Sequence, residues 1–149
     1  MNRFRFRFRS VLRYREIIEE NKKKDFGVAL KHLTHEESNL ARIDTAITQH
    51  AELMEKSGQG SVSAHDLQNK FNYARQLDKK KNSQKTLIEK VEIVLESKRT
   101  ALVEATKKKK IFERLKERDR VAYDEATRKE EQALSDDLTS MRFKKNTDQ

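Results

Sequence analysis

The sequence predicts an all-α fold in which two long helices form an antiparallel coiled-coil hairpin, with the second helix longer than the first. Charged residues make up 40% of the 149 residues and the mean hydropathy is −1.03, which leaves little apolar material for a thick core. The chain has no proline and three glycines, so few residues interrupt a helix. Apolar residues nevertheless recur every seven positions, which favours a coiled coil over a disordered chain.

The first helix is predicted to run from about residue 10 to residue 56. Its apolar face follows one heptad position, occupied by Phe26, Leu33, Leu40, Ile47 and Met54. We expect Leu30, Ile43 and Ala51 to fill the same face from neighbouring turns. The same phase extends back to Leu12 and passes through the polar residue Glu19.

A loop is predicted over residues 57–63, where Gly58 and Gly60 interrupt the helical pattern. We expect these glycines to adopt left-handed backbone conformations. Ser63 is a candidate N-cap for the next helix, because Asp66 follows three residues later, as in a capping box.

The second helix is predicted from about residue 64 to residue 142, with residues 144–149 frayed and the whole chain, 1–149, forming one coiled-coil domain. Two interlocking heptad positions carry its apolar residues: Leu67, Ala74, Ile88, Leu95 and Leu102 at one, and Leu77, Val91, Ala105 and Phe112 at the other. Beyond Phe112 the apolar face is expected to shift to Ile111, Leu115 and Ala122.

Polar residues interrupt this apolar face at Lys81, Gln84, Lys98 and Lys109. A two-stranded coil tolerates them if their methylene groups lie on the partner helix and their polar ends reach water. A strongly self-associating homodimer would be expected to lack such residues, so we disfavour a purely structural dimer.

The residue patterns predict no catalytic site, no metal site and no cofactor. Gly58 and Gly60 lack the following Gly-Lys-Ser/Thr of a phosphate-binding loop. His32, His35 and Glu36 lie within one helical stretch, but the second histidine of a zinc-protease helix is missing. There is no cysteine and no apolar run long enough to span a bilayer, and we expect a cytoplasmic protein that is not an enzyme.

The amino-terminal residues alternate phenylalanine with arginine, at Phe4, Phe6 and Phe8 and at the positions around them. This period-two pattern is typical of a strand, but there is no sheet to join, so we expect frayed helix before Ser10. Docking on an acidic protein surface is the favoured interpretation. Packing back on the helix pair, and binding to nucleic acid or lipid, remain alternatives.

The same residues resemble the start of the FliJ family of flagellar export proteins, in which aromatic and aliphatic positions are followed by an arginine. The matching positions are Phe4, Phe6, Phe8, Val11, Leu12 and Arg15, with Phe8 where the family commonly has leucine. Two further stretches, residues 112–118 and 130–138, also resemble the family, and Ser135 departs from its common form.

The resemblance implies a non-catalytic stalk of the flagellar type III export apparatus, located in the cytoplasm at the inner face of the membrane. Its implied partners are the export ATPase ring, the export-gate membrane protein and the export chaperones, with no small molecule and with nucleic acid disfavoured. The candidate partner-binding residues are Phe4, Phe6, Phe8, Arg9, Val11, Leu12, Arg15, Phe112, Leu115, Arg118 and Leu138. The alternatives are the stalk of a virulence type III secretion system and a basic coiled coil that binds nucleic acid.

Overall fold

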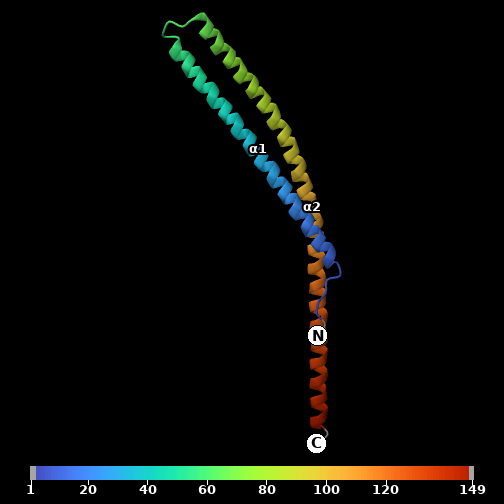
Figure 1. Ribbon diagram of the computed structural model, residues 1–149. Coiled ribbons are helices and arrows are strands. Elements are labelled where there is room, and N and C mark those ends of the chain that lie inside the picture. Colours follow the sequence, from blue (N-terminus) through green and yellow to red (C-terminus); the bar gives the residue numbers. More distant parts are fainter. Residues whose placement is uncertain (1–2, 148–149) are drawn as a thin grey trace. The chain divides into compact units, whose positions relative to one another are not determined.

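The computed structural model describes residues 3–147, with side chains placed up to residue 143. Two helices account for most of this stretch: α1 spans Arg9–Ser57 and α2 spans Ala64–Thr147. The described residues contain no strand. The two helices pack against each other in antiparallel directions and α2 is the longer, which confirms the predicted fold class (Figure 1).

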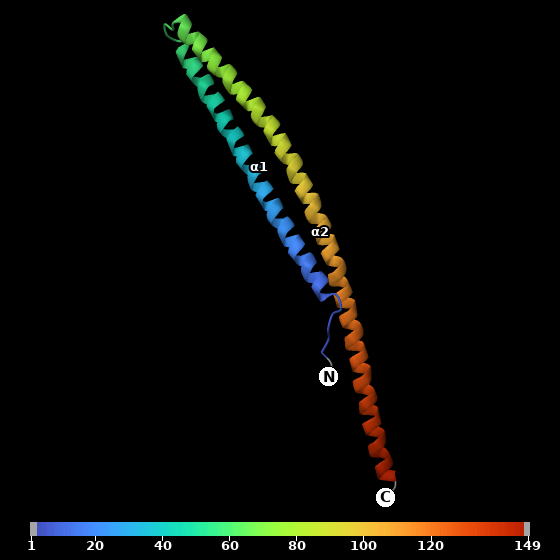
Figure 2. The same cartoon turned by 45° about the vertical axis from the view of Figure 1, so that its right-hand side comes forward.

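The chain divides into two units, which we describe separately. The hairpin unit is Glu20–Val103 and contains the loop with the helical segments on either side of it. The terminal unit combines Met1–Glu19 with Glu104–Gln149, so it joins the start of α1 to the second half of α2. In the hairpin unit the two helical segments lie side by side and the loop connects their ends (Figure 2).

The core of the hairpin unit is a single layer between two helices, and no residue in it is completely buried. Ala29 of α1 and Leu77, Val91 and Leu95 of α2 are its most buried apolar residues. The prediction that Leu30 and Ala51 lie on the apolar face of α1 is wrong, because both side chains are exposed. The second position of the α1 heptad lies three residues after the first, which places Ala29, Glu36, Ile43 and His50 against α2.

Polar residues within the apolar face have partners across the helix pair. The Gln84 side-chain amide donates to Oε2 of the buried Glu36 at 2.6 Å and to the Glu36 carbonyl oxygen at 3.0 Å. Lys81 Nζ lies 2.7 Å from Oδ1 of Asp44. Lys81 remains partly exposed, and the sequence did not predict the carboxylate that α1 supplies opposite Lys81 and Gln84.

The loop closes without left-handed glycine, contrary to expectation, since no described residue has positive φ. Instead, α1 ends in a helical turn in which the Gly58 amide donates to the Met54 carbonyl at 3.2 Å. The predicted N-cap of α2 is confirmed, because the Asp66 amide donates to Ser63 Oγ at 3.1 Å. Lys70 Nζ also donates to Ser57 Oγ at 2.6 Å and so links the two sides of the loop.

The described part of α2 extends beyond the expected end near residue 142, because its helical backbone continues to Thr147. The expected fraying of residues 144–149 is not seen up to that point, and Asp148 and Gln149 lie outside the described residues. Within the described residues, neither helix combines the length and the apolar character needed to cross a membrane.

The contact between Glu36 and Gln84 predicts that the stability of the hairpin unit changes with pH in the acidic range. Hydrogen bonds from Gln84 and then Asn39 hold the pKa of Glu36 below its usual value of 4.5. The ionised group therefore stabilises the folded state above pH 4.5, and this contribution is lost as the pH falls through the lowered pKa. In Glu36→Gln, the side chain keeps a hydrogen-bond acceptor but does not titrate.

We expect the stability difference between the wild type and Glu36→Gln to shrink as the pH falls from neutral to below 4.5, measured as urea midpoints by circular dichroism. The exposed neighbour Glu37 supplies the control, since Glu37→Gln is expected to follow the wild type. Parallel curves for wild type and Glu36→Gln would show that the negative charge of Glu36 does not stabilise the hairpin unit.

Candidate docking surface of the terminal unit

The amino-terminal segment of the terminal unit, residues 3–8, is not helical, so the expectation of frayed helix is wrong. Its side chains alternate in exposure: Arg3, Arg5 and Arg7 are exposed, whereas the phenylalanines between them are partly or fully buried. Residues 3–6 have no regular secondary structure, and Arg7 and Phe8 form a turn that leads into α1. The period-two pattern therefore separates buried from exposed side chains in a segment that packs on a helix and not in a sheet.

Aromatic contacts hold this segment against α2. The ring centroids of Phe4 and Tyr123 are 5.6 Å apart, and those of Phe8 and Phe112 are 6.2 Å apart. Phe6 contacts Phe8 edge-on at 5.9 Å and is only 6% exposed. Among the alternatives left open by the sequence, packing back on the helix pair is the one that the structure shows.

Of the eleven predicted partner-binding residues, eight are buried or half-buried and three are exposed. Six lie within or beside the aromatic cluster and are buried or half-buried, namely Phe4, Phe6, Phe8, Leu12, Phe112 and Leu115. Val11 and Arg15 are half-buried at the start of α1, and the Arg15 guanidinium lies 5.8 Å from the Tyr14 ring. Arg9, Arg118 and Leu138 are exposed.

The predicted shift of the apolar face to Ile111 and Ala122 is wrong, because both side chains are exposed. The positions of α2 that are at least half-buried after Phe112 are Leu115, Asp119, Tyr123 and Thr127. The sequence did not identify Tyr123 as a packed position, because the neighbouring residues on its face of α2 are polar. Its partner, Phe4, comes from outside the helical pattern.

A charged contact joins the start of α1 to α2 within the terminal unit. Glu19 is 6% exposed; its Oε2 lies 2.7 Å from Lys109 Nζ, and its Oε1 accepts a hydrogen bond from Thr106 Oγ1 at 2.9 Å. The hydrogen bond to Glu19 raises the pKa of Lys109 above its usual value of 10.5. Lys109 was recognised as an interruption of the apolar face, but its carboxylate partner was not.

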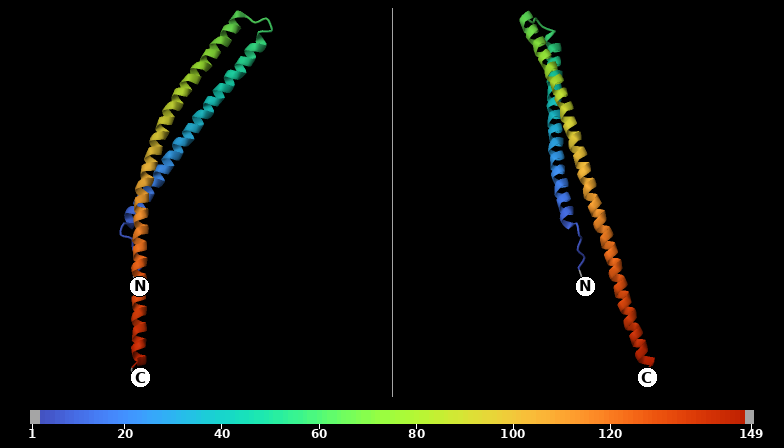
Figure 3. Two further views of the ribbon diagram at one scale, coloured as in Figure 1. Left: turned by 180° about the vertical axis from the view of Figure 1, so that it is seen from behind. Right: turned by 90° about the vertical axis from the view of Figure 1, so that its right-hand side faces the viewer.

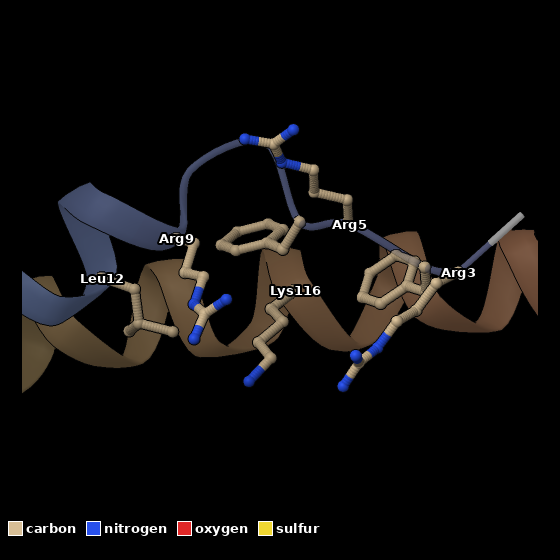
Figure 4. Close-up of a pocket in the computed structure, with 7 residues that line it drawn as sticks. Arg3, Arg5, Arg9, Leu12 and Lys116 are labelled. Atoms are coloured by element: carbon tan, nitrogen blue, oxygen red, sulfur yellow. The ribbon is translucent and has the colours of Figure 1, made fainter.

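Basic side chains surround a groove of about 780 Å³ beside the aromatic cluster. The groove is lined by Arg3, Phe4, Arg5, Phe6, Arg9, Leu12 and Lys116. Figure 4 shows the charged ends of Arg3, Arg9 and Lys116 directed to one side of α2, whereas Arg5 points the opposite way. Phenylalanine and leucine thus form the base of the groove, and cations form its rim.

The last described turns of α2 carry an apolar stripe without any contact to α1. Leu134, Leu138 and Met141 follow a spacing of four and three residues, so they share one face, and they are 65%, 61% and 68% exposed. Leu134 and Met141 continue, at heptad spacing, from the half-buried Thr127, and Tyr123, which contacts Phe4, lies one turn before Thr127. In the views of Figure 3, α2 extends past the start of the described chain.

The described residues contain no group of three or more histidine or acidic side chains arranged to hold a metal ion. His32 and Glu36, which the sequence placed near each other, lie 3.4 Å apart in the hairpin unit as an i,i+4 pair. This contact lies along α1, and the same Glu36 carboxylate accepts the hydrogen bond from Gln84. The candidate binding surfaces of the terminal unit are therefore the exposed apolar stripe of α2 and the groove lined by basic residues.

The Glu19–Lys109 contact predicts a stability loss that a surface ion pair would not give. Lys109→Leu removes the cation beside a buried carboxylate, so we expect the free energy of unfolding to fall by about 1–3 kcal/mol. Arg120→Leu is the matched control on the same helix, because Arg120 and Asp124 lie 3.9 Å apart and are mostly exposed. We expect that change to cost less than about 0.5 kcal/mol.

Both variants are measured by urea titration. Replacing Glu19 and Lys109 together by leucine should recover much of the loss, since no buried charge remains. Equal costs for Lys109→Leu and Arg120→Leu would mean that the buried contact contributes no more than a surface pair.

Because Phe6 is buried, we expect its truncation to loosen the amino-terminal segment without disturbing the hairpin unit. Phe6→Ala removes the most buried ring of the aromatic cluster, and a truncation of this kind typically costs about 3 kcal/mol. Hydrogen exchange measured by mass spectrometry should become faster over residues 12–19, where the amides of α1 are hydrogen-bonded, with exchange in the hairpin unit unchanged. The exposed Phe71, truncated to alanine, is the control and should leave residues 12–19 protected as in the wild type. Unchanged exchange in Phe6→Ala would contradict the packing described above.

Comparison with known proteins gives one family. The model of the family described as flagellar FliJ protein matches residues 4–148. The search of curated proteins and the search of solved structures gave no match.

Proposed function

The chain belongs to the flagellar FliJ protein family, which makes it a component of the flagellar export apparatus, and from this premise we propose that it is a non-catalytic stalk. In this role it would bind the export ATPase ring and the membrane-embedded export gate from the cytoplasm, at the inner face of the membrane, and would assist the delivery of substrates by their chaperones. Membership of a flagellar family favours this role over that of a stalk in a virulence secretion system.

The observation that carries the proposal is the unpartnered stripe of Leu134, Leu138 and Met141. These residues continue a face that is paired earlier along α2, and they expose large apolar side chains to water. A helix with such a stripe is suited to pack against another protein by the same ridge-and-groove contacts that pair α1 with α2. We therefore propose that this stripe binds the ATPase ring.

The aromatic cluster has a supporting role in this proposal. Phe4, Phe6 and Phe8 pack within the chain, so they are unsuited to act as free anchors for a partner. Together with the Glu19–Lys109 contact, they fix the start of α1 on α2. Of the predicted partner-binding residues, Arg9, Arg118 and Leu138 remain available on the surface.

Mechanistically, the stalk would act through differential binding. A ring that hydrolyses ATP passes through several conformations, and a helix that binds some of them more tightly shifts their populations. Reciprocally, each change of the ring would alter its hold on the helix. Because a long helix resists bending, contacts made at one segment are transmitted along it without chemistry in the stalk itself.

Leu138 provides a test with a matched control. We expect Leu138→Gln to weaken retention of the source bacterium's purified flagellar export ATPase by roughly tenfold, since interface anchors commonly contribute 1–2 kcal/mol or more. Leu53 has nearly the same exposure, 60% against 61%, but lies on α1 in the hairpin unit. Leu53→Gln should bind as tightly as the wild type. The measurement is surface-immobilised binding in detergent buffer, with helicity checked by circular dichroism.

Equal binding of Leu138→Gln and wild type would place the ATPase contact elsewhere. Absence of any binding by the wild type would contradict the stalk proposal itself. Salt-sensitive retention of nucleic acid in place of the ATPase would favour the basic coiled-coil alternative.

A further inference from the structure

The positive charge of the protein is concentrated in two segments that pack together. Residues 3–15 and 107–120 contain fourteen basic and three acidic residues, a net charge of +11, whereas the whole chain has +9. The remaining residues are therefore close to neutral. Both segments belong to the terminal unit, where the Phe8–Phe112 contact joins them. We call their exposed side the basic surface.

Folding leaves much of this charge without a carboxylate partner. In the described residues, no ion pair involves Arg3, Arg5, Arg9 or Lys116. The first turn of α1 also lacks an acidic residue, so the positive end of the helix dipole adds to the arginine charges. Holding like charges together in this way costs free energy, and an anionic partner would lower that cost.

From this arrangement we propose that the basic surface binds the phosphate headgroups of anionic phospholipids, and that the terminal unit lies against a membrane surface. This binding goes beyond the proposed contact with the ATPase ring and uses different residues. Guanidinium groups bind phosphate oxygens through paired N–H donors, so arginine suits this ligand.

The geometry favours an extended anionic surface over a single bound anion. Arg3, Arg9 and Lys116 all point to one side of α2, spread along the helix, so these three cations can meet one anionic surface together, whereas Arg5 points the opposite way (Figure 4). Large apolar side chains in the same segments are exposed, including Tyr14 at 60% and Ile111 at 62%. Arginine with exposed tyrosine and isoleucine is the combination typical of shallow binding at a lipid interface.

Nucleic acid fits this surface less well. Sequence-tolerant binding of single strands depends on aromatic rings whose faces are free to stack with bases. Here Phe4 packs against Tyr123, Phe6 is buried, and Phe8 lies between Phe6 and Phe112. The phenylalanine rings are therefore not free to stack with bases, and membrane lipids present a continuous layer of phosphate to the exposed cations.

The test is flotation of the purified full-length chain with lipid vesicles at physiological salt. One set of vesicles contains phosphatidylglycerol and phosphatidylcholine in equal parts, and the other contains phosphatidylcholine alone. The wild type should bind the first set and not the second, and higher salt should weaken binding. The triple variant Arg3→Gln, Arg9→Gln and Lys116→Gln removes the three cations that point to the same side, and it should bind about a hundredfold more weakly, since each cation near the surface contributes about fivefold.

A control variant removes the same charge from the hairpin unit. Lys79, Lys80 and Lys85 are exposed, and their joint replacement by glutamine should leave vesicle binding within about twofold of the wild type. Circular dichroism confirms that each variant remains helical. Equal losses in the two triple variants, or equal binding of the wild type to both vesicle sets, would overturn the proposal.

The same variants separate lipid binding from the other functions. Leu138→Gln should bind anionic vesicles normally, and the triple variant of Arg3, Arg9 and Lys116 should still bind the ATPase in detergent, so either proposal can fail without the other. If vesicles do not bind and these three cations instead control retention of an acidic protein or of a single-stranded oligonucleotide, the basic surface binds that ligand and the lipid proposal is wrong.

Discussion

The pairing of polar groups across the helix interface is the constraint on which the rest of this structure depends. The three pairs are Glu19 with Lys109, Glu36 with Gln84, and Asp44 with Lys81, and in each the acidic residue is on α1. As residue numbers rise along α1, the partner numbers fall along α2, which is the antiparallel arrangement. A slip along the helices would leave Glu19 and Glu36 buried opposite apolar residues, at a cost that apolar contacts elsewhere would not recover. The polar pairs therefore select one register from the several that a repetitive apolar face permits.

That register also determines what the amino-terminal segment contacts. With Glu19 held beside Lys109 and Thr106, the residues before it reach Phe112 and then Tyr123. The amino-terminal segment packs its phenylalanines towards α2 and leaves its arginines exposed to solvent, so one short peptide contributes both to packing and to charge. The segment thereby brings its arginines beside Lys116, and the basic surface depends on packing of residues far apart in the sequence.

Two kinds of surface remain exposed after these contacts are made, and they differ in chemistry. The stripe of Leu134, Leu138 and Met141 is apolar and belongs to a helix, which suits packing against another protein. The basic surface is a spread of cations over an aromatic base, which suits an extended anionic layer.

The sequence by itself determined the two helices, their antiparallel pairing and the cap at Ser63, because heptad spacing, a short loop and a local hydrogen bond depend on residues close in the chain. It also identified Lys81, Gln84 and Lys109 as interruptions. Only the tertiary structure decided which carboxylates face them, and that Phe4, Phe6 and Phe8 pack inward against α2. The physical reason is that register and long-range packing depend on the summed fit of both helices, and a periodic pattern in one segment does not specify its alignment with another.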